Sequence, residues 1–184
     1  MRKSLVLLGI LDDSDVEWMI RVGSKRSIPA GTTLIHEGKA IDSLFIVLQG
    51  AFEITIAAQK GKVIANLMPG EILGEMSFID SRPPSATVTA AQDSLVLDIG
   101  RSEFRERLDE DPNFQGRFYR SLAVLLSLRL RDTVATFGYG KQPRLDENID
   151  DGDEISEDIL DAVSLAGMRF GMLQERTRST GYAV

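Results

Sequence analysis

The stretch Pro69–Ala90, PGEILGEMSFIDSRPPSATVTA, decides how the rest of the chain is interpreted. It joins a glycine-rich turn, an expected single helical turn over Glu75–Ile79, and a loop that enters a β-branched strand. Backbone N–H groups at the start of a helix, together with those of a following loop, can form a nest for a phosphate. The stretch therefore predicts an anion-binding cassette.

Short β-branched runs separated by glycines surround this cassette. The glycines recur at roughly 8–12 residues, a spacing typical of a small all-β sandwich or barrel rather than of alternating βαβ units. We expect strands at Thr32–Ile35, Leu44–Leu48, Phe52–Ile56, Lys62–Leu67, Ala86–Ala90 and Ser94–Ile99. The predicted fold class is mainly β with flanking helices: an antiparallel, jelly-roll-like β-roll.

Helices are expected before and after the roll. Ser14 and Glu17 fit the capping-box spacing and predict a short N-terminal helix to about Val22, which Gly23 would end in a left-handed turn. After the roll, Arg101–Leu108 predicts a short helix, and Asp111 with Pro112 opens a long one to about Thr136.

The long helix carries two sets of apolar residues. One set repeats every four residues, at Phe114, Phe118, Leu122, Leu126, Leu130 and Val134, and the other consists of Val124, Leu125 and Leu128. Both sets could pack within one chain. Alternatively, an uncovered apolar face of this length would be an association surface, which favours a homodimer through residues 113–136.

The last part of the chain changes in composition. Residues 137–158 are rich in glycine, Asp and Glu and predict an acidic flexible linker. Residues 159–184 predict a C-terminal amphipathic helix and tail, in which Ile159, Val163, Ala166, Phe170 and Leu173 form an apolar face. We therefore divide the chain into residues 1–136, the roll with its long helix, followed by the linker and the C-terminal helix.

Composition excludes several function classes. The net charge of −7 disfavours non-specific attraction to nucleic acid or to anionic membranes. The absence of cysteine excludes disulfides, thiolate nucleophiles and cysteine-ligated metals. The apolar run Leu5–Leu11 is followed at once by two aspartates and is too short for a membrane span, so we expect a cytoplasmic protein.

The order of these motifs resembles the cyclic nucleotide-binding domain family, which includes catabolite-activator-type regulators and the regulatory subunit of cyclic-AMP-dependent protein kinase. The resemblance spans about Leu11–Thr136. The family's phosphate cassette looks like G-E-L-A-L, a short loop, then P-R-A/S/T-A-T-V. This chain has GEMSF at residues 74–78 and PPSATV at residues 83–88.

The resemblance implies a set of binding residues. Glu75, flanked by Gly74 and Met76, would accept the ribose 2′-hydroxyl, and backbone N–H groups near Ser85 and Ala86, with the Ser85 hydroxyl, would face the cyclic phosphate. The possible ligand is cyclic AMP or cyclic GMP, or another small anion, and no other cofactor is expected.

One residue departs from the family's pattern. Pro84 occupies the arginine position of the cassette and provides neither a charge nor a backbone N–H. Two lost charge-assisted hydrogen bonds correspond to a loss of roughly 10²–10⁴ in affinity. Arg82, two residues earlier, either folds back to the phosphate or is a solvated loop arginine.

Other chemistries find little support. The chain has a single histidine, His36. One histidine beside Glu37 cannot complete a metal triad, and no Gly-x-Ser-x-Gly motif accompanies it for Ser/His/Asp catalysis. We interpret His36 as a turn residue near Gly38. Asp146, Asn148, Asp150 and Glu157 have calcium-loop spacing, but Asp151 stands where an EF-hand needs glycine. We expect neither an enzyme nor a metal site.

Two hypotheses remain. The first is a non-catalytic regulatory or sensor module that signals through helix rearrangement to an unknown protein partner. The second is a ligand-independent interaction or scaffold domain that has lost nucleotide binding. Nothing after Thr136 resembles a basic recognition helix, so neither hypothesis includes direct binding of nucleic acid or of a membrane.

Overall fold

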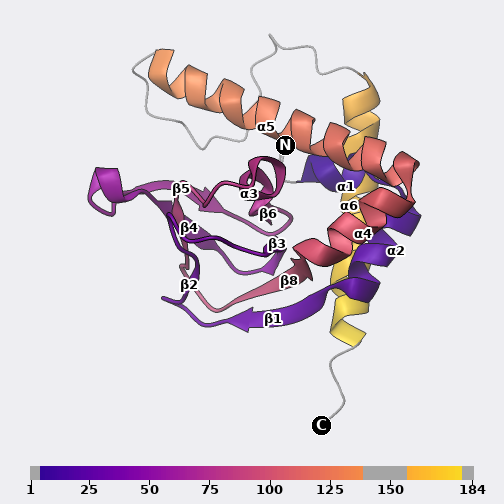
Figure 1. The fold of residues 1–184 in the computed structure, drawn as a ribbon, viewed down its shortest axis with the longest axis horizontal. Helices are drawn as coiled ribbons and strands as arrows, with labels where there is room; N and C mark the ends of the chain where they lie inside the picture. The colour runs from indigo at the N-terminus through magenta and orange to yellow at the C-terminus, as the bar shows by residue number, and fades with distance from the viewer. Residues whose placement is uncertain (1–4, 139–156, 180–184) are drawn as a thin grey trace.

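The computed structural model describes residues 5–138 and 157–179 (Figure 1). Its helices are α1 Val6–Ile10, α2 Asp13–Val22, α3 Glu75–Asp80, α4 Arg101–Glu110, α5 Pro112–Gly138 and α6 Glu157–Ser179, with a short 3₁₀ helix, η2, at Ala57–Gln59. Its strands are β1 Ser24–Ile28, β2 Thr33–Ile35, β3 Ser43–Gln49, β4 Phe52–Thr55, β5 Val63–Leu67, β6 Ile72–Leu73, β7 Thr87–Ala90 and β8 Ser94–Gly100.

The strands form two four-stranded antiparallel sheets, in the orders β1-β8-β3-β6 and β2-β7-β4-β5. The predicted fold class, a mainly β antiparallel roll with flanking helices, is confirmed. Helices α1, α2, α4 and α6 gather at one side of the roll, while α5 runs from this helical layer across α3 (Figure 1). The six predicted strands and the predicted turn of helix in the cassette are all present.

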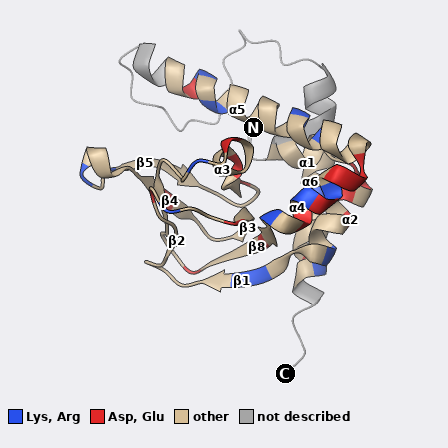
Figure 2. Cartoon of the chain, viewed as in Figure 1, with Lys and Arg blue, Asp and Glu red and all other residues tan. Residues whose placement is uncertain are grey.

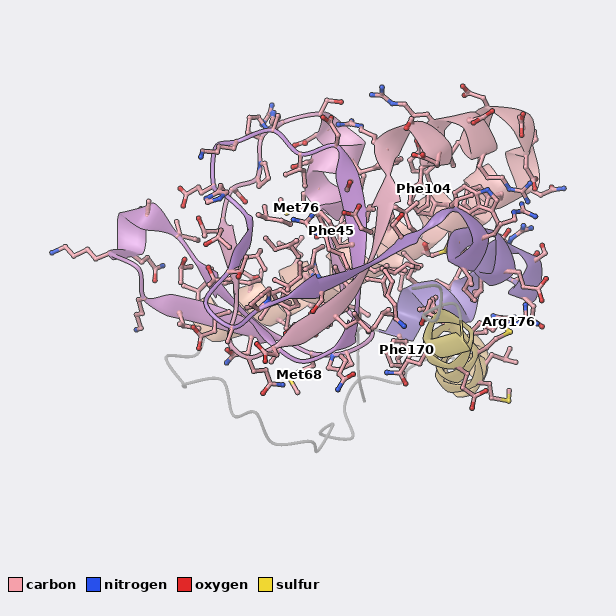
Figure 3. All side chains as sticks on the ribbon, turned by 90° about the horizontal axis from the view of Figure 1, so that it is seen from below. Phe45, Met68, Met76, Phe104, Phe170 and Arg176 are labelled. Carbon is pink, nitrogen blue, oxygen red and sulfur yellow. The ribbon has the colours of Figure 1, made fainter. Side chains whose placement is uncertain are left out.

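Strand β3 divides the hydrophobic core into two clusters. Its side chains alternate between the two faces of the sheet, as the strand period requires. Leu44, Ile46 and Leu48 belong to the cluster shared with the helices, whereas Phe45 and Val47 belong to the cluster inside the roll. Figure 3 labels Phe45 in the roll and Phe104 and Phe170 on the helical side.

Two strands have no clear sequence signal. Strand β1 has the sequence SKRSI and pairs with β8, but four of its five residues are exposed. Such a polar edge strand lacks the apolar alternation on which strand prediction depends. Strand β6 is only two residues long and pairs with β3 at Phe45 and Ile46.

The N-terminal prediction was wrong in detail. The capping box of α2 consists of Asp12 and Asp15, not of Ser14 and Glu17: the Asp15 N–H donates to Asp12 Oδ1 (2.9 Å), and the Asp12 N–H donates to Asp15 Oδ2 (3.0 Å). Gly23 is extended, with φ −75°, rather than left-handed. Because Asp is as good an N-cap as Ser, the sequence allowed both registers.

Asp15 also connects α2 to α5. Its carboxylate is fully buried and accepts two hydrogen bonds from Arg117, one from Nε at 2.7 Å and one from Nη2 at 2.9 Å. The hydrogen bond that Arg117 donates to Asp15 is the largest of the effects that raise the pKa of Arg117. A bidentate pair of this kind fixes the orientation of α5 relative to α2.

The apolar pattern of α5 follows the helical period more closely than the predicted four-residue repeat. Phe114, Phe118 and Leu122 are buried as predicted, but Leu130 and Val134 are 64% and 61% exposed. A repeat of four advances about 40° per step relative to the 3.6-residue turn, so its later members rotate away from the core. The buried face instead continues through Leu125, which was assigned to the second set.

Helix α6 packs against α1 and α2 of the same chain (Figure 1). Ala166, Phe170 and Leu173 are buried in the helical cluster, as predicted for its apolar face. Arg169 binds Asp13 and the carbonyl of Leu8 at the ends of α1 and α2. The predicted linker falls almost entirely outside the described residues.

Acidic and basic residues are interspersed along α4 and in the segments around it (Figure 2). Pairs such as Arg107 with Asp111, at 2.9 Å, and Arg26 with Asp98, at 3.4 Å, account for part of this pattern. Among the described residues, no helix combines the length and the apolar content that crossing a bilayer requires.

Candidate ligand-binding site

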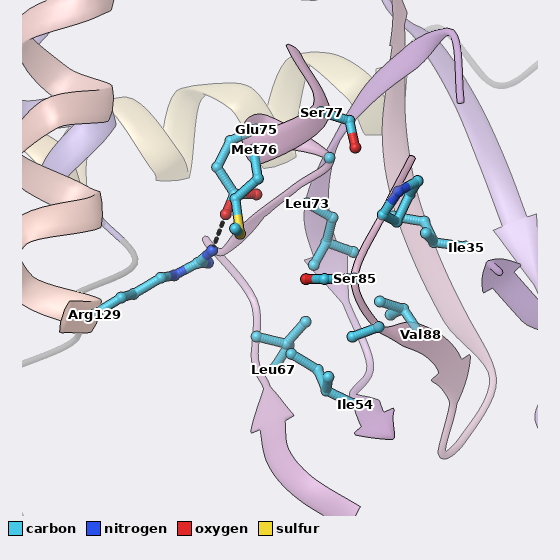
Figure 4. A pocket seen from close by; sticks show the side chains of 13 residues that line it. Ile35, Ile54, Leu67, Leu73, Glu75, Met76, Ser77, Ser85, Val88 and Arg129 are labelled. Atoms are coloured by element: carbon cyan, nitrogen blue, oxygen red, sulfur yellow. Dashed lines mark hydrogen bonds and ion pairs between the residues drawn. The ribbon is translucent and has the colours of Figure 1, made fainter. Parts of the chain in front are cut away.

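A cavity of about 110 Å³ lies between the roll, α3 and α5 (Figure 4). One wall is the apolar interior of the roll, and the other consists of α3 and the cassette loop. The lining residues are Ile35, Ile54, Leu67, Leu73, Gly74, Glu75, Met76, Ser77, Pro84, Ser85, Ala86, Val88 and Arg129.

Gly74 precedes α3 at a position that strongly favours glycine. Its φ is +87°, in the left-handed region, and an added Cβ would lie 2.8 Å from the Ser43 carbonyl oxygen and 2.9 Å from Ile41 Cδ1. Glycine therefore satisfies both a backbone conformation and a close approach to β3. The consequence is that Glu75, the first residue of α3, is held over the cavity.

Glu75 is 4% exposed and forms an ion pair with Arg129 of α5 (Figure 4). The same guanidinium donates from Nη2 to the Ile72 carbonyl at 3.1 Å. A buried carboxylate is costly unless it is paired, and Arg129 supplies the pairing charge. The cavity and the long helix therefore share one electrostatic contact.

A second carboxylate, Glu71, lies 3.9 Å from Arg129 Nη2. Burial raises the pKa of Glu71 above its ordinary value, Arg129 opposes this rise, and the negative charge of Glu75 adds to it. Two carboxylates, Glu75 in the lining of the cavity and Glu71 outside it, thus compete for one guanidinium.

The far end of α3 is fixed by Arg101. Its Nη2 donates to the Phe78 carbonyl at 3.1 Å and to Ser81 Oγ at 2.8 Å, and its guanidinium lies over the Phe78 ring at 5.5 Å. The Phe78 ring in turn contacts Phe104 and Phe118 edge-on, at centroid distances of 5.6 and 5.5 Å. Helix α3 is therefore coupled to α4 and α5 through aromatic packing as well as through Glu75.

The structure brings five of the six predicted site residues together. Gly74, Glu75, Met76, Ser85 and Ala86 all line the cavity, although Met76 is half exposed, at 52%. Their role in binding a ligand stays a prediction.

Arg82 does not line the cavity. Its side chain is 83% exposed, its Nε lies 4.0 Å from Asp80, and its backbone N–H donates to Asp80 Oδ1 at 3.0 Å. Of the two alternatives for Arg82, this position matches the solvated loop arginine.

Pro84 lines the cavity at the arginine position of the cassette. Its carbonyl accepts a hydrogen bond from the Gly38 N–H at 2.8 Å, which holds the loop against the turn between β2 and β3. His36 lies in the same turn region and is exposed, with its carbonyl accepting from the Lys39 N–H at 3.2 Å. The loop is therefore well anchored although it carries no cation at position 84.

Sequence reasoning missed Arg129. The assumed four-residue repeat directed attention to Leu126 and Leu130 and away from position 129. The position is seven residues after Leu122 and four after Leu125, which places it on the buried face of α5. A single arginine in line with a buried apolar stripe is a signal that could have identified it.

Within residues 5–138 and 157–179, no group of three or more His, Cys, Asp or Glu residues has the geometry to hold a metal ion. The acidic stretch with calcium-loop spacing lies outside the described residues, apart from Glu157.

Comparison with known proteins now identifies the roll. The family model described as the cyclic nucleotide-binding domain matches residues 25–111. These residues form a domain of that family. A crystal structure of a cyclic nucleotide-binding domain from Methylobacillus flagellatus superposes with a TM-score of 0.67 and 23% identity, covering 78% of this chain and 86% of that one.

Two further proteins are similar over shorter stretches. The Pycsar effector protein XpPycTIR of Xanthomonas perforans is 32% identical over 117 residues, which is 63% of this chain and 36% of that protein. The regulatory domain of Toxoplasma gondii PKA, crystallised with cAMP, gives a TM-score of 0.51 at 28% identity and covers 55% of this chain and 39% of that one. The chain thus spans only about a third of the length of the first of these curated relatives.

Proposed function

We propose that this chain is a non-catalytic regulatory module that binds a cyclic nucleotide in the cavity and signals through α5 to another protein. One observation carries the proposal: Glu75, the expected ribose contact, lines the cavity and at the same time pairs with Arg129 of α5. A ligand that occupies the cavity must alter this contact. The related domain of Toxoplasma gondii PKA was crystallised with cAMP, which supports the ligand class.

The binding roles follow the family cassette. Glu75 accepts the ribose 2′-hydroxyl, and the N–H groups around Ser85 and Ala86 bind the cyclic phosphate. Gly74 positions α3, and the half-exposed Met76 covers the entrance, where its flexible side chain can adapt to a base. The apolar interior of the roll provides the remaining surface.

The signal leaves the site through α3. Helix α3 contacts α5 at two points, the Glu75 ion pair with Arg129 and the ring contact of Phe78 with Phe118. A ligand that binds two arrangements of α3 with different affinity shifts the population of α5 positions. Such a shift changes which apolar side chains α5 exposes.

The output surface is the exposed part of α5. Leu130, Val134 and Tyr119 are 64%, 61% and 45% exposed, and they suit a helix-to-helix interface. The proposal therefore includes a homodimer through residues 113–136, a further protein partner, and a location in the cytoplasm. It includes no contact with nucleic acid or with membranes.

The alternative function is a ligand-independent interaction domain. Pro84 favours it, because the cassette loop has lost the cation that normally binds the phosphate. The retained cavity and the positions of Glu75 and Ser85 favour the sensor.

Calorimetric titration with cyclic AMP and cyclic GMP distinguishes the two functions. The sensor requires binding by the native chain, and because Arg82 is exposed, the Arg82→Ala variant should bind as the native chain does. Absence of binding by the native chain, together with binding by Pro84→Arg, would establish an intact pocket without an anion contact and would favour the interaction domain.

A further inference from the structure

The positive charge at the cavity comes from the long helix and not from the cassette. Among the described residues that line the cavity, Arg129 is the one cation. Its side chain extends from α5 to the start of α3, opposite Ser85 (Figure 4), and Pro84 lines the same cavity. The cassette loop cannot supply a cation at Pro84, and Arg82 is turned to solvent.

The guanidinium of Arg129 is chemically suited to an oxyanion. It carries five N–H donors in a planar fork, and its hydrogen bonds to Glu75 and to the Ile72 carbonyl use one each from Nη1 and Nη2. Its side chain is 34% exposed, so the head group can change partner without crossing the core. Arg129 is therefore a cation at the site with donors that a second anion can reach.

We propose that Arg129 binds the phosphate of the ligand in place of the missing cassette arginine, in exchange for Glu75. This proposal rests on the proposed function and names the residue that makes it work despite Pro84. Both side chains keep a partner in this exchange. Arg129 leaves the Glu75 carboxylate and pairs with the phosphate, and Glu75 leaves the guanidinium and accepts a hydrogen bond from the ribose hydroxyl. A ligand with an anionic phosphate next to a free hydroxyl satisfies both residues at once.

The size of the cavity agrees with an exchange rather than with simple addition. Its volume of about 110 Å³ is below the roughly 300–1,000 Å³ that small-molecule sites usually have. The ligand therefore needs lining side chains to move, and Glu75, Met76 and Arg129 are the long side chains among them.

The part of α5 around Arg129 is also the part best able to move when a ligand binds. Phe118 and Leu122 are buried, but Leu130 and Val134, beyond Arg129, are mostly exposed. The contacts of Arg129 with Glu75 and Ile72 tie this half of α5 to the roll. When the phosphate replaces Glu75 as the partner of Arg129, binding at the site directly changes the position of the C-terminal half of α5.

Calorimetric titration of the full chain with cyclic AMP and cyclic GMP tests the proposal. Arg129→Gln should weaken binding by about tenfold to a hundredfold, the range expected for a lost charge-assisted contact. Arg129→Lys, which keeps the charge but not the fork, should lie between the native chain and Arg129→Gln. Arg131→Gln is the matched control: it removes the same charge from an exposed position two residues away and should bind as the native chain does.

A rescue variant separates loss of the cation from loss of structure. Arg129→Gln leaves Glu75 buried without its partner, so a weakened variant alone would not identify the cause. Adding Pro84→Arg to Arg129→Gln should restore binding, because the cassette then supplies the cation. Failure of this rescue, with the double variant folded by circular dichroism, would mean that Arg129 acts structurally and would overturn the proposal.

The remaining outcomes are also decisive. Unchanged or tighter binding by Arg129→Gln would mean that Arg129 only closes the empty site, which overturns the phosphate role and leaves the sensor function standing. If the native chain binds neither nucleotide and Pro84→Arg does, Arg129 does not replace the cassette arginine. If both fail to bind, the proposed function itself is wrong.

Discussion

Arg129 donates to Glu75 across 54 residues of sequence and joins the long helix to the first residue of the cassette helix. The pairing explains how a nearly buried carboxylate is tolerated in an apolar cavity. It also places a cation beside a loop whose own arginine position is Pro84. Substitutions near this contact should therefore affect stability and binding in separable ways.

Glu71 should make the domain less stable as pH rises. Because burial raises its folded pKa above the ordinary 4.5, the native state holds a proton that the unfolded state releases first. The stability from this group is complete below pH 4.5 and falls as pH rises through the folded pKa. Glu71→Gln should remove this loss and make the chain more stable than the native protein at pH 7.

Urea unfolding at pH 4.5 and at pH 7 measures this effect. Glu53→Gln makes the same chemical change in β4 and is the control. A Glu71→Gln variant that is less stable than the native chain at pH 7 would contradict the prediction.

Gly74→Ala should destabilise the fold more than Gly61→Ala does. Both glycines have positive φ, +87° and +76°, so both variants suffer backbone strain. Only at position 74 would the new methyl group meet β3 at less than 3 Å, while nothing lies within 4 Å at position 61. The additional cost at Gly74 should be about 1–3 kcal/mol in urea unfolding. Equal costs at the two positions would mean that α3 moves freely away from β3.

Arg117→Gln should destabilise the chain by about 3–5 kcal/mol, because it leaves the fully buried Asp15 carboxylate without its bidentate partner. Arg120→Gln removes an exposed arginine from the same helix and should change the free energy of unfolding by less than about 0.5 kcal/mol. Chemical denaturation of both variants checks the difference. A small effect at Arg117 would show that water, or the amide of the introduced glutamine, donates to the Asp15 carboxylate instead.

Leu173→Ala should show that α6 is part of the folded domain. Leu173 is fully buried against the helical cluster, so its truncation should cost about 2–5 kcal/mol. Leu165→Ala makes the same chemical change at a residue of α6 that is 41% exposed, and should cost much less. If both variants unfold like the native chain in thermal denaturation, α6 does not stabilise the roll.

The sequence predicts the local features of this fold better than its long-range contacts. The cassette helix and six strands are predicted because glycine spacing and apolar runs are local signals. Gly74, Glu75 and Ser85 lie together because they belong to one continuous motif. Strand β1 is missed because its pairing partner, β8, comes from about 70 residues away and its own side chains are polar.

Arg129 illustrates what sequence-based prediction of the candidate site misses. No local pattern relates it to Glu75, since the contact depends on how α5 crosses α3. The four-residue repeat further concealed it, because that repeat drifts away from the true core face. The predicted N-cap of α2 was wrong for a different reason: two acceptable caps, Asp12 and Ser14, are only two residues apart.

The alternation of β3 provides a way to follow the proposed response to a ligand. Phe45 and Val47 face the roll interior, whereas Leu44 and Ile46 face the helical layer. Methyl or ring resonances of adjacent residues in one strand therefore report on two separate compartments. A nucleotide that fills the roll should first perturb the signals of Phe45 and Val47, and the signals of Leu44 and Ile46 should follow only when the helices rearrange. Binding of the ligand in the roll and rearrangement of the helices can then be observed separately within one strand of seven residues.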